Sequence, residues 1–161
     1  MLLATAYGRI IYIDFPYRGK VIDKESKQPI GGAAVVAVWW METFTFVQAM
    51  ISFYEAHESV TDQEGNFTAP WVWGASINPL KKVRRPLFTV FKPGYEAYSE
   101  RHLERPLGWS RTVVELRRLS SQKERLENLT AAYLGPLVPE KKYPMLNRLK
   151  SVERVNLGLT E

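Results

Sequence analysis

The side chains best suited to metal or acid–base chemistry are two histidines that stand close to glutamates. His57 lies between Glu55 and Glu58, and His102 lies between two further glutamates. A catalytic metal site generally uses three protein ligands of the His or carboxylate type. Residues two apart on a strand share a face, so Glu55 and His57 would point together. A metal held by Glu55, His57 and His102 is therefore one hypothesis, and packed or surface histidines are the alternative.

The sequence contains none of the usual motifs for nucleophilic catalysis or phosphate binding. There is no Gly-x-Ser-x-Gly, no phosphate-binding loop and no Ser–His–Asp set. The chain has no cysteine, which excludes disulfides, thiolate metal sites and a cysteine nucleophile. We therefore predict that the protein is not an enzyme, with no catalytic residues, no metal and no cofactor.

Two tryptophans and a basic run are the candidates for binding. Trp71 and Trp73 fall in residues 70–86, which we expect to form a loop, where indole rings could stack on sugars or on an apolar peptide. Core packing is the alternative for these rings. The same stretch carries four basic side chains: Lys81, Lys82, Arg84 and Arg85. They could neutralise phosphates or a carboxylate-rich partner, or they could form a solvated turn.

The net charge of +5 is unevenly distributed along the chain. Residues 1–79 carry a net charge of −3, residues 80–118 one of +6 and residues 119–161 one of +2. A basic second half could meet an anionic partner such as a phosphate-rich envelope surface, or it could be a solvated face. No nucleic-acid-binding motif occurs, so we expect no nucleic acid partner.

The elements that must position these side chains are mostly short strands between turns. Residues 33–40 combine small, β-branched and aromatic side chains, which indicates a central strand buried on both faces. Residues 44–54 mix strand and helix patterns, and we interpret them as an irregular insertion. Further strands are expected at residues 8–14, 17–23, 55–61, 65–69, 87–91, 95–98 and 112–116. Seven or eight such strands favour a sandwich of two sheets.

The turns between strands carry a recognisable pattern. In residues 61–67, Asp62 can close an Asx-type turn and Gly65 can supply a positive φ before the next strand. The other turn residues that we expect to determine the fold are Gly19, Gly31, Pro93 and Gly94.

Four stretches in this order, GKVID, QPIGGAAVVAVW, ESVTDQEGNF and FKPGY, resemble the carboxypeptidase regulatory-like domain. The resemblance covers about residues 17–118. It implies a transthyretin-like Greek-key sandwich of two sheets and about seven strands. It also implies a domain without catalytic residues of its own, which accompanies peptidases, surface receptors and secreted binding proteins.

The remaining residues flank this sandwich. Residues 1–16 are expected to be a leader or arm, because residues 1–6 look like the end of a signal peptide. No stretch is long enough to span a membrane. Residues 119–161 are expected to form a helical extension, which packs on the sandwich or on a partner.

Two short helices are expected in that extension. Ser121 and Glu124 form a capping box, and the first helix should cover a face made of Leu126, Leu129 and Tyr133. A second helix is expected to begin at Pro144 and to carry three apolar side chains on one face: Leu146, Leu149 and Val152.

Together these observations predict a non-enzymatic envelope or extracellular β-sandwich that binds or scaffolds another macromolecule. We expect it in the periplasm, at the cell surface or outside a bacterial cell, with another protein of that compartment as its partner. Self-association stays open. The alternatives are a carbohydrate- or peptide-binding module that uses Trp71 and Trp73, and a metal-dependent enzyme that uses the two histidines.

Overall fold

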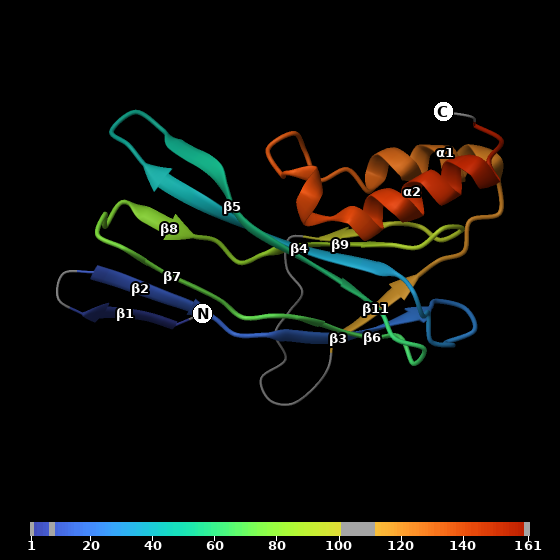
Figure 1. Ribbon diagram of the computed structural model, residues 1–161, viewed down its shortest axis with the longest axis horizontal. Helices are drawn as coiled ribbons and strands as arrows, with labels where there is room; N and C mark the ends of the chain where they lie inside the picture. The colour runs from blue at the N-terminus through green and yellow to red at the C-terminus, as the bar shows by residue number, and fades with distance from the viewer. Residues whose placement is uncertain (1, 7–8, 101–111, 160–161) are drawn as a thin grey trace.

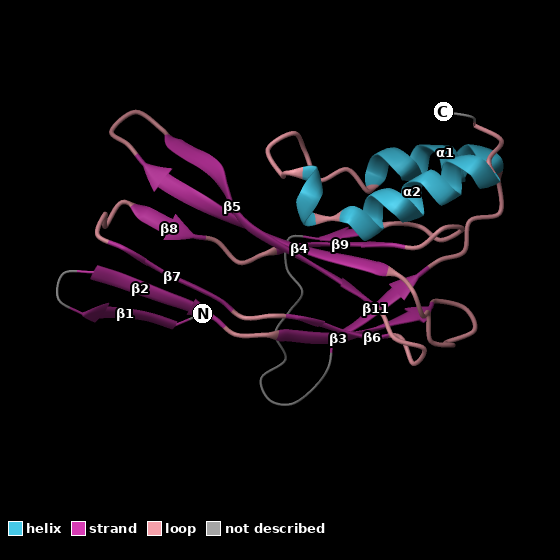
Figure 2. Cartoon of the chain, viewed as in Figure 1, coloured by secondary structure: helices cyan, strands magenta, loops and turns pink. Residues whose placement is uncertain are grey.

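The protein folds into two packed β-sheet layers, with a layer of helices on the outer face of one of them (Figure 1). This computed structural model describes residues 2–6, 9–100 and 112–159. Strands dominate and the helices are confined to the C-terminal part of the chain (Figure 2). The predicted mainly β, sandwich-like fold with a short helical appendage is confirmed.

The first layer is built from two short sheets that follow one another. Both have three strands: β11 (Thr112–Leu116), β3 (Tyr17–Asp23) and β6 (Asn66–Ala69) in one, and β1 (Leu2–Ala6), β2 (Arg9–Asp14) and β7 (Val72–Ser76) in the other. β2 runs on into β3, and β6 into β7, across two residues each, so one strand pair passes through both sheets. β11 runs parallel to β3, and the other pairs are antiparallel.

The second layer is one larger sheet. Its strands are β4 (Ala34–Phe44), β5 (Ala49–Val60), β8 (Lys81–Val83), β9 (Leu87–Phe91) and β10 (Tyr98–Glu100), in the order β10-β9-β4-β5, with β8 pairing β4 beyond the end of β9. β4 is buried on both faces from Ala34 to Trp39. Val35, Ala37 and Trp39 face the other sheet layer, and the residues between them face the helices. The expectation of a doubly buried central strand is thus confirmed.

A buried carboxylate sits in the core between the sheets. Asp14 is 1% exposed and accepts hydrogen bonds from Trp39 Nε1 at 2.8 Å and from the Tyr17 hydroxyl at 3.1 Å. A buried polar group is tolerated when it is hydrogen-bonded, and these bonds fix the large Trp39 ring. The core also reaches Tyr12 on β2, within the residues expected to be an arm.

The turn between β5 and β6 has the geometry that its sequence predicts. The Asp62 carboxylate accepts from the Asn66 amide at 2.8 Å and from the Glu64 amide at 3.0 Å, and Gly65 has a φ of +76°. A Cβ at Gly65 would overlap the Val21 carbonyl, and one at Gly19 would overlap the Phe67 ring. Both glycines are therefore needed for close approach of neighbouring chain segments.

Two further predicted turn positions need glycine for different reasons. A Cβ at Gly31 would lie 2.8 Å from the Asp62 carbonyl oxygen. Gly94, which follows Pro93, has a φ of +80°, and its amide donates to the Glu153 carboxylate at 3.2 Å.

The C-terminal helices are α1 (Gln122–Ala131), η1 (Glu140–Lys142) and α2 (Pro144–Asn156). The capping box of Ser121 and Glu124 is present. α2 begins at Pro144, as predicted, and its Leu146 is buried. Leu146 packs in one cluster with Val36 of β4, so the helices cover their own sheet.

The predicted covered face of α1 is wrong for two of its three side chains, whereas Leu129 is partly buried and packs against the cluster beneath the helices, as predicted. Leu126 is 49% exposed and Tyr133 is 60% exposed. The buried side of α1 is carried by Asn128, whose amide group donates to the Tyr95 carbonyl and accepts from the Ala97 amide. Polar anchors to the chain after β9 therefore set the rotation of α1, and a pattern of apolar spacing could not reveal them.

Candidate functional site

The two candidate tryptophans lie at the outer face of the first sheet layer. Trp71 is 56% exposed, and Trp73, which belongs to β7, is 62% exposed. Trp73 is directly opposite Ile13 of β2, so the two side chains share a face. The predicted loop at residues 70–86 is therefore wrong, since β7 and β8 both fall in it.

Local sequence explains why the Trp73 ring points outward. Side chains alternate along a strand, and the neighbours Val72 and Gly74 face the core. A Cβ at Gly74 would overlap the Tyr12 hydroxyl, so only glycine lets β7 lie this close. The outward side chains here form what we call the aromatic face: Ile11, Ile13, Phe15, Trp71 and Trp73.

The backbone edge of β7 is less accessible to a partner than the Trp73 ring. The Trp73 carbonyl accepts a hydrogen bond from the Tyr54 hydroxyl at 3.4 Å. Addition of a partner strand along this edge would compete with that contact. The part of β7 that a partner can reach is the indole ring.

The four basic candidates are divided between two roles. Arg84 makes a bidentate ion pair with Glu42, with distances of 2.9 Å from Nε and 2.5 Å from Nη2. This hydrogen bonding lowers the pKa of Glu42 and raises that of Arg84. Lys81, Lys82 and Arg85 are exposed, and the described residues offer them no ion pair. Only these three can face an anionic partner.

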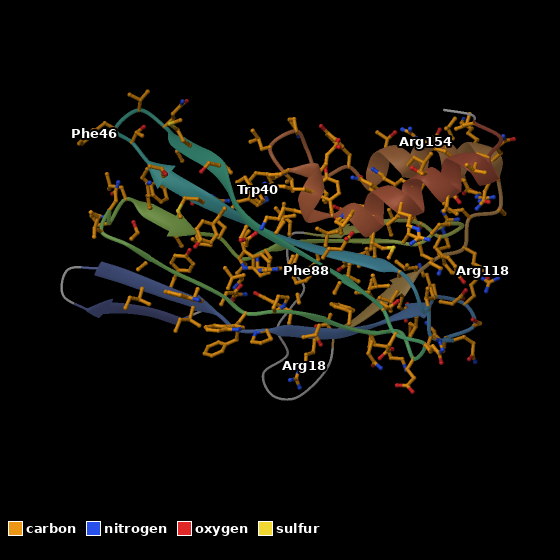
Figure 3. All side chains as sticks on the ribbon, in the orientation of Figure 1. Arg18, Trp40, Phe46, Phe88, Arg118 and Arg154 are labelled. Carbon is orange, nitrogen blue, oxygen red and sulfur yellow. The ribbon has the colours of Figure 1, made fainter. Side chains whose placement is uncertain are left out.

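Sequence reasoning missed a second surface at the end of the molecule opposite the helices. β4 and β5 form one continuous hairpin there, so the irregular insertion expected at residues 44–54 is wrong. Its end and the adjoining β7–β8 connection expose large apolar side chains, which we call the apolar tip: Phe44, Phe46, Val47, Met50, Ile51, Ile77 and Leu80. Phe46 stands at the far end of the hairpin (Figure 3).

One signal in the sequence could have found this surface. No charged residue occurs between Glu42 and Glu55. An uncharged strand pair is normally covered by other elements, whereas Phe46 is 108% exposed and Val47 is 92% exposed. Large exposed apolar patches of this kind mark contact surfaces.

The residues proposed for a metal are otherwise engaged. The Glu55 carboxylate accepts from Lys142 Nζ at 2.5 Å. Burial raises the pKa of Glu55, but hydrogen bonds from Lys142 and from the Ala56 amide outweigh it, and the net pKa is lowered. The His57 ring meets the Trp39 ring edge to face at 5.8 Å, and burial lowers the pKa of His57. His102 lies outside the described residues, and no group of three metal-ligating side chains occurs within them.

Comparison of the chain with known proteins gives no relative from which a role could be carried over. No family model, no curated protein and no solved structure matches it significantly. The resemblance to the carboxypeptidase regulatory-like domain therefore stays a prediction. In the described part of the chain, no helix is long and apolar enough to cross a membrane.

Proposed function

We propose that the protein is a non-enzymatic envelope or extracellular β-sandwich that binds another protein through its aromatic face. The observation that carries this proposal is the exposure of both Trp71 and Trp73 on the outer side of a hydrogen-bonded sheet. Tryptophan is enriched among the residues that dominate binding energy at protein interfaces. The extracellular location rests on the family resemblance alone.

The arrangement suits binding better than packing. Trp73 and Ile13 are directly opposed on paired strands, so a partner meets a preformed surface without reordering the backbone. Each tryptophan can bury a large area and donate one hydrogen bond from its indole N–H. A ring pair on a sheet also fits a flat ligand such as a sugar, so a carbohydrate- or peptide-binding module is the second candidate.

A photo-crosslinking amino acid at position 73 tests the proposal in cells. Val155 on α2 is 71% exposed and lies in the helix layer, so the same amino acid at position 155 is the matched control. We expect one major protein adduct from position 73 that is absent from position 155. Pull-down with the chain that carries no crosslinker should recover that same protein, and Trp73→Ser should abolish this recovery, whereas Val155→Ser should not.

Indistinguishable adducts from the two positions would contradict the proposal. Carbohydrate binding has a separate readout, because a bound sugar should quench tryptophan fluorescence and Trp73→Ser should remove that response.

A further inference from the structure

The hairpin end of the apolar tip belongs to the second sheet layer, whereas the aromatic face belongs to the first. The β4–β5 hairpin projects beyond the helix layer, and Trp40 marks the place where that cover ends (Figure 3). Beyond it, Phe44, Phe46 and Val47 are exposed without any acidic or basic neighbour on the hairpin turn. Apolar side chains this exposed lower the solubility of a protein, and these three contribute little to its core.

The hairpin turn is held by its own hydrogen bonds. The Thr45 amide donates to the Gln48 carbonyl at 3.1 Å, and the Gln48 amide donates to the Thr45 hydroxyl at 3.1 Å. The Thr45 hydroxyl also donates to the Gln48 carbonyl at 2.6 Å. These hydrogen bonds hold the backbone that carries Phe46 and Val47, which lowers the ordering cost of contact.

Two basic side chains of β8 stand beside the base of the tip, one on each face of the sheet. Lys82 and Ile51 are both opposite Glu42, so these two side chains share one face. Lys81 and Met50 are both opposite Thr43, so they share the other face. We call Lys81, Lys82 and Arg85 the basic collar.

The described residues give the collar no ion pair with an acidic side chain. Glu42 is the acidic side chain next to it, and Glu42 is 7% exposed and paired with Arg84. An apolar end with exposed basic side chains beside its base complements a target that is apolar inside and negative at its surface. That is the layering of a bilayer that contains anionic lipids.

We propose that the apolar tip inserts into an anionic lipid surface, with the basic collar over the headgroups. Neither signal alone anchors a protein stably, but an apolar insertion combined with a basic patch does. A second copy is a poorer occupant, because joining two tips would bring two basic collars together. The inference is independent of the proposed protein partner, since it uses a different surface.

Vesicle flotation of the purified full chain tests this inference. We expect binding to phosphatidylcholine vesicles that contain phosphatidylglycerol, little binding to phosphatidylcholine alone, and weaker binding as salt rises. Val47→Asp should weaken binding at least about tenfold, because a carboxylate would enter the interface. The matched control Val155→Asp introduces the same charge at an exposed valine on α2 and should bind like the unmodified protein.

Two further variants separate the parts of the surface. Lys81→Ala and Lys82→Ala should each weaken binding about fivefold and reduce its salt dependence. Phe46→Ser repeats the test of the tip should Val47→Asp fail to give a folded protein by circular dichroism.

Absence of flotation with anionic vesicles would overturn the inference, as would equal binding by Val47→Asp and Val155→Asp. Dimers in sedimentation that Val47→Asp abolishes, without vesicle binding, would assign the tip to a second copy and also overturn it. None of these results bears on crosslinking at position 73, so the two proposals fail separately.

Discussion

The same two strands, β4 and β5, behave differently at their two ends. Where Ala34–Val38 pairs with Ala56–Val60, the sheet is covered by its own helices, and the helix-facing side chains of β4 are fully buried. At the hairpin end the side chains of Phe44, Met50 and Ile51 remain between 45% and 57% exposed. Both ends of β4 carry apolar side chains, so residue type along this strand does not distinguish a stabilising surface from a contact surface.

The covered end of the β4–β5 pair also differs from the hairpin end in its polar contacts. At the covered end, Glu58 accepts from the Met145 and Leu146 amides at 2.8 and 2.7 Å, and so caps α2. Arg125 makes a bidentate ion pair with Glu153, which is fully buried. These contacts tie the helices to the sheet and to each other. Loss of side chains at this end should therefore lower stability, and loss at the hairpin end should not.

The largest effect is expected from Leu146→Ala in α2. Leu146 is 1% exposed and packs on β4, so the cavity should cost about 4 kcal/mol of unfolding free energy. Urea denaturation measures it. Leu126→Ala on α1 is the control, because Leu126 is 49% exposed and should change stability by less than about 1 kcal/mol. Equal losses in both variants would mean that the helix layer is not packed as described.

Arg125→Met should come next. Burial raises the pKa of Glu153, but the hydrogen bonds from Arg125 and the Gly94 amide outweigh this effect, so the pKa is lowered overall. The buried carboxylate therefore depends on its partner. Removing Arg125 leaves that charge uncompensated and should cost about 3 kcal/mol. Arg154→Met alters an exposed arginine of the same helical layer and should be nearly neutral. A neutral Arg125→Met in urea denaturation would show that the pair adds nothing to the covered end.

Glu58→Ala should have a smaller effect, because it removes a cap rather than a core side chain. Loss of a side-chain cap at a helix N-terminus costs about 1 kcal/mol. Amide hydrogen exchange should show faster exchange at Met145 and Leu146 than at residues in the middle of α2. Glu127→Ala, at an exposed position of α1, is the control and should leave those amides protected. Unchanged protection in Glu58→Ala would contradict the role of β5 in fixing α2.

The smallest effect on stability is expected at the hairpin end. Phe46→Ser should change the unfolding free energy by less than about 0.5 kcal/mol, because the ring contacts solvent in the free protein. The variant should nevertheless be more soluble, which light scattering measures. A stability loss as large as that of Leu146→Ala would remove the distinction between the two ends.

The sequence by itself determined the features that depend on neighbouring residues. The Asp62–Gly65 turn, the capping box at Ser121 and the doubly buried start of β4 all follow from local geometry and from side-chain periodicity. These patterns were enough to predict a mainly β sandwich with a short helical appendage. Each one is specified within a few residues, so no distant contact is needed to infer it.

Only the tertiary structure decided which apolar faces are covered. Glu58 and Leu146 are 88 residues apart, and Asn128 of α1 bonds the chain after β9 from 31 to 33 residues away. Because of such contacts, α1 buries Asn128 in place of Leu126 and Tyr133. Residues 70–86, which were expected to form a loop, contain β7 and β8 because these segments pair with β2 and β4. The exposure of Trp73 and of the apolar tip is settled in the same way. The physical reason is that burial belongs to the assembled layers, and side-chain type alone does not determine it.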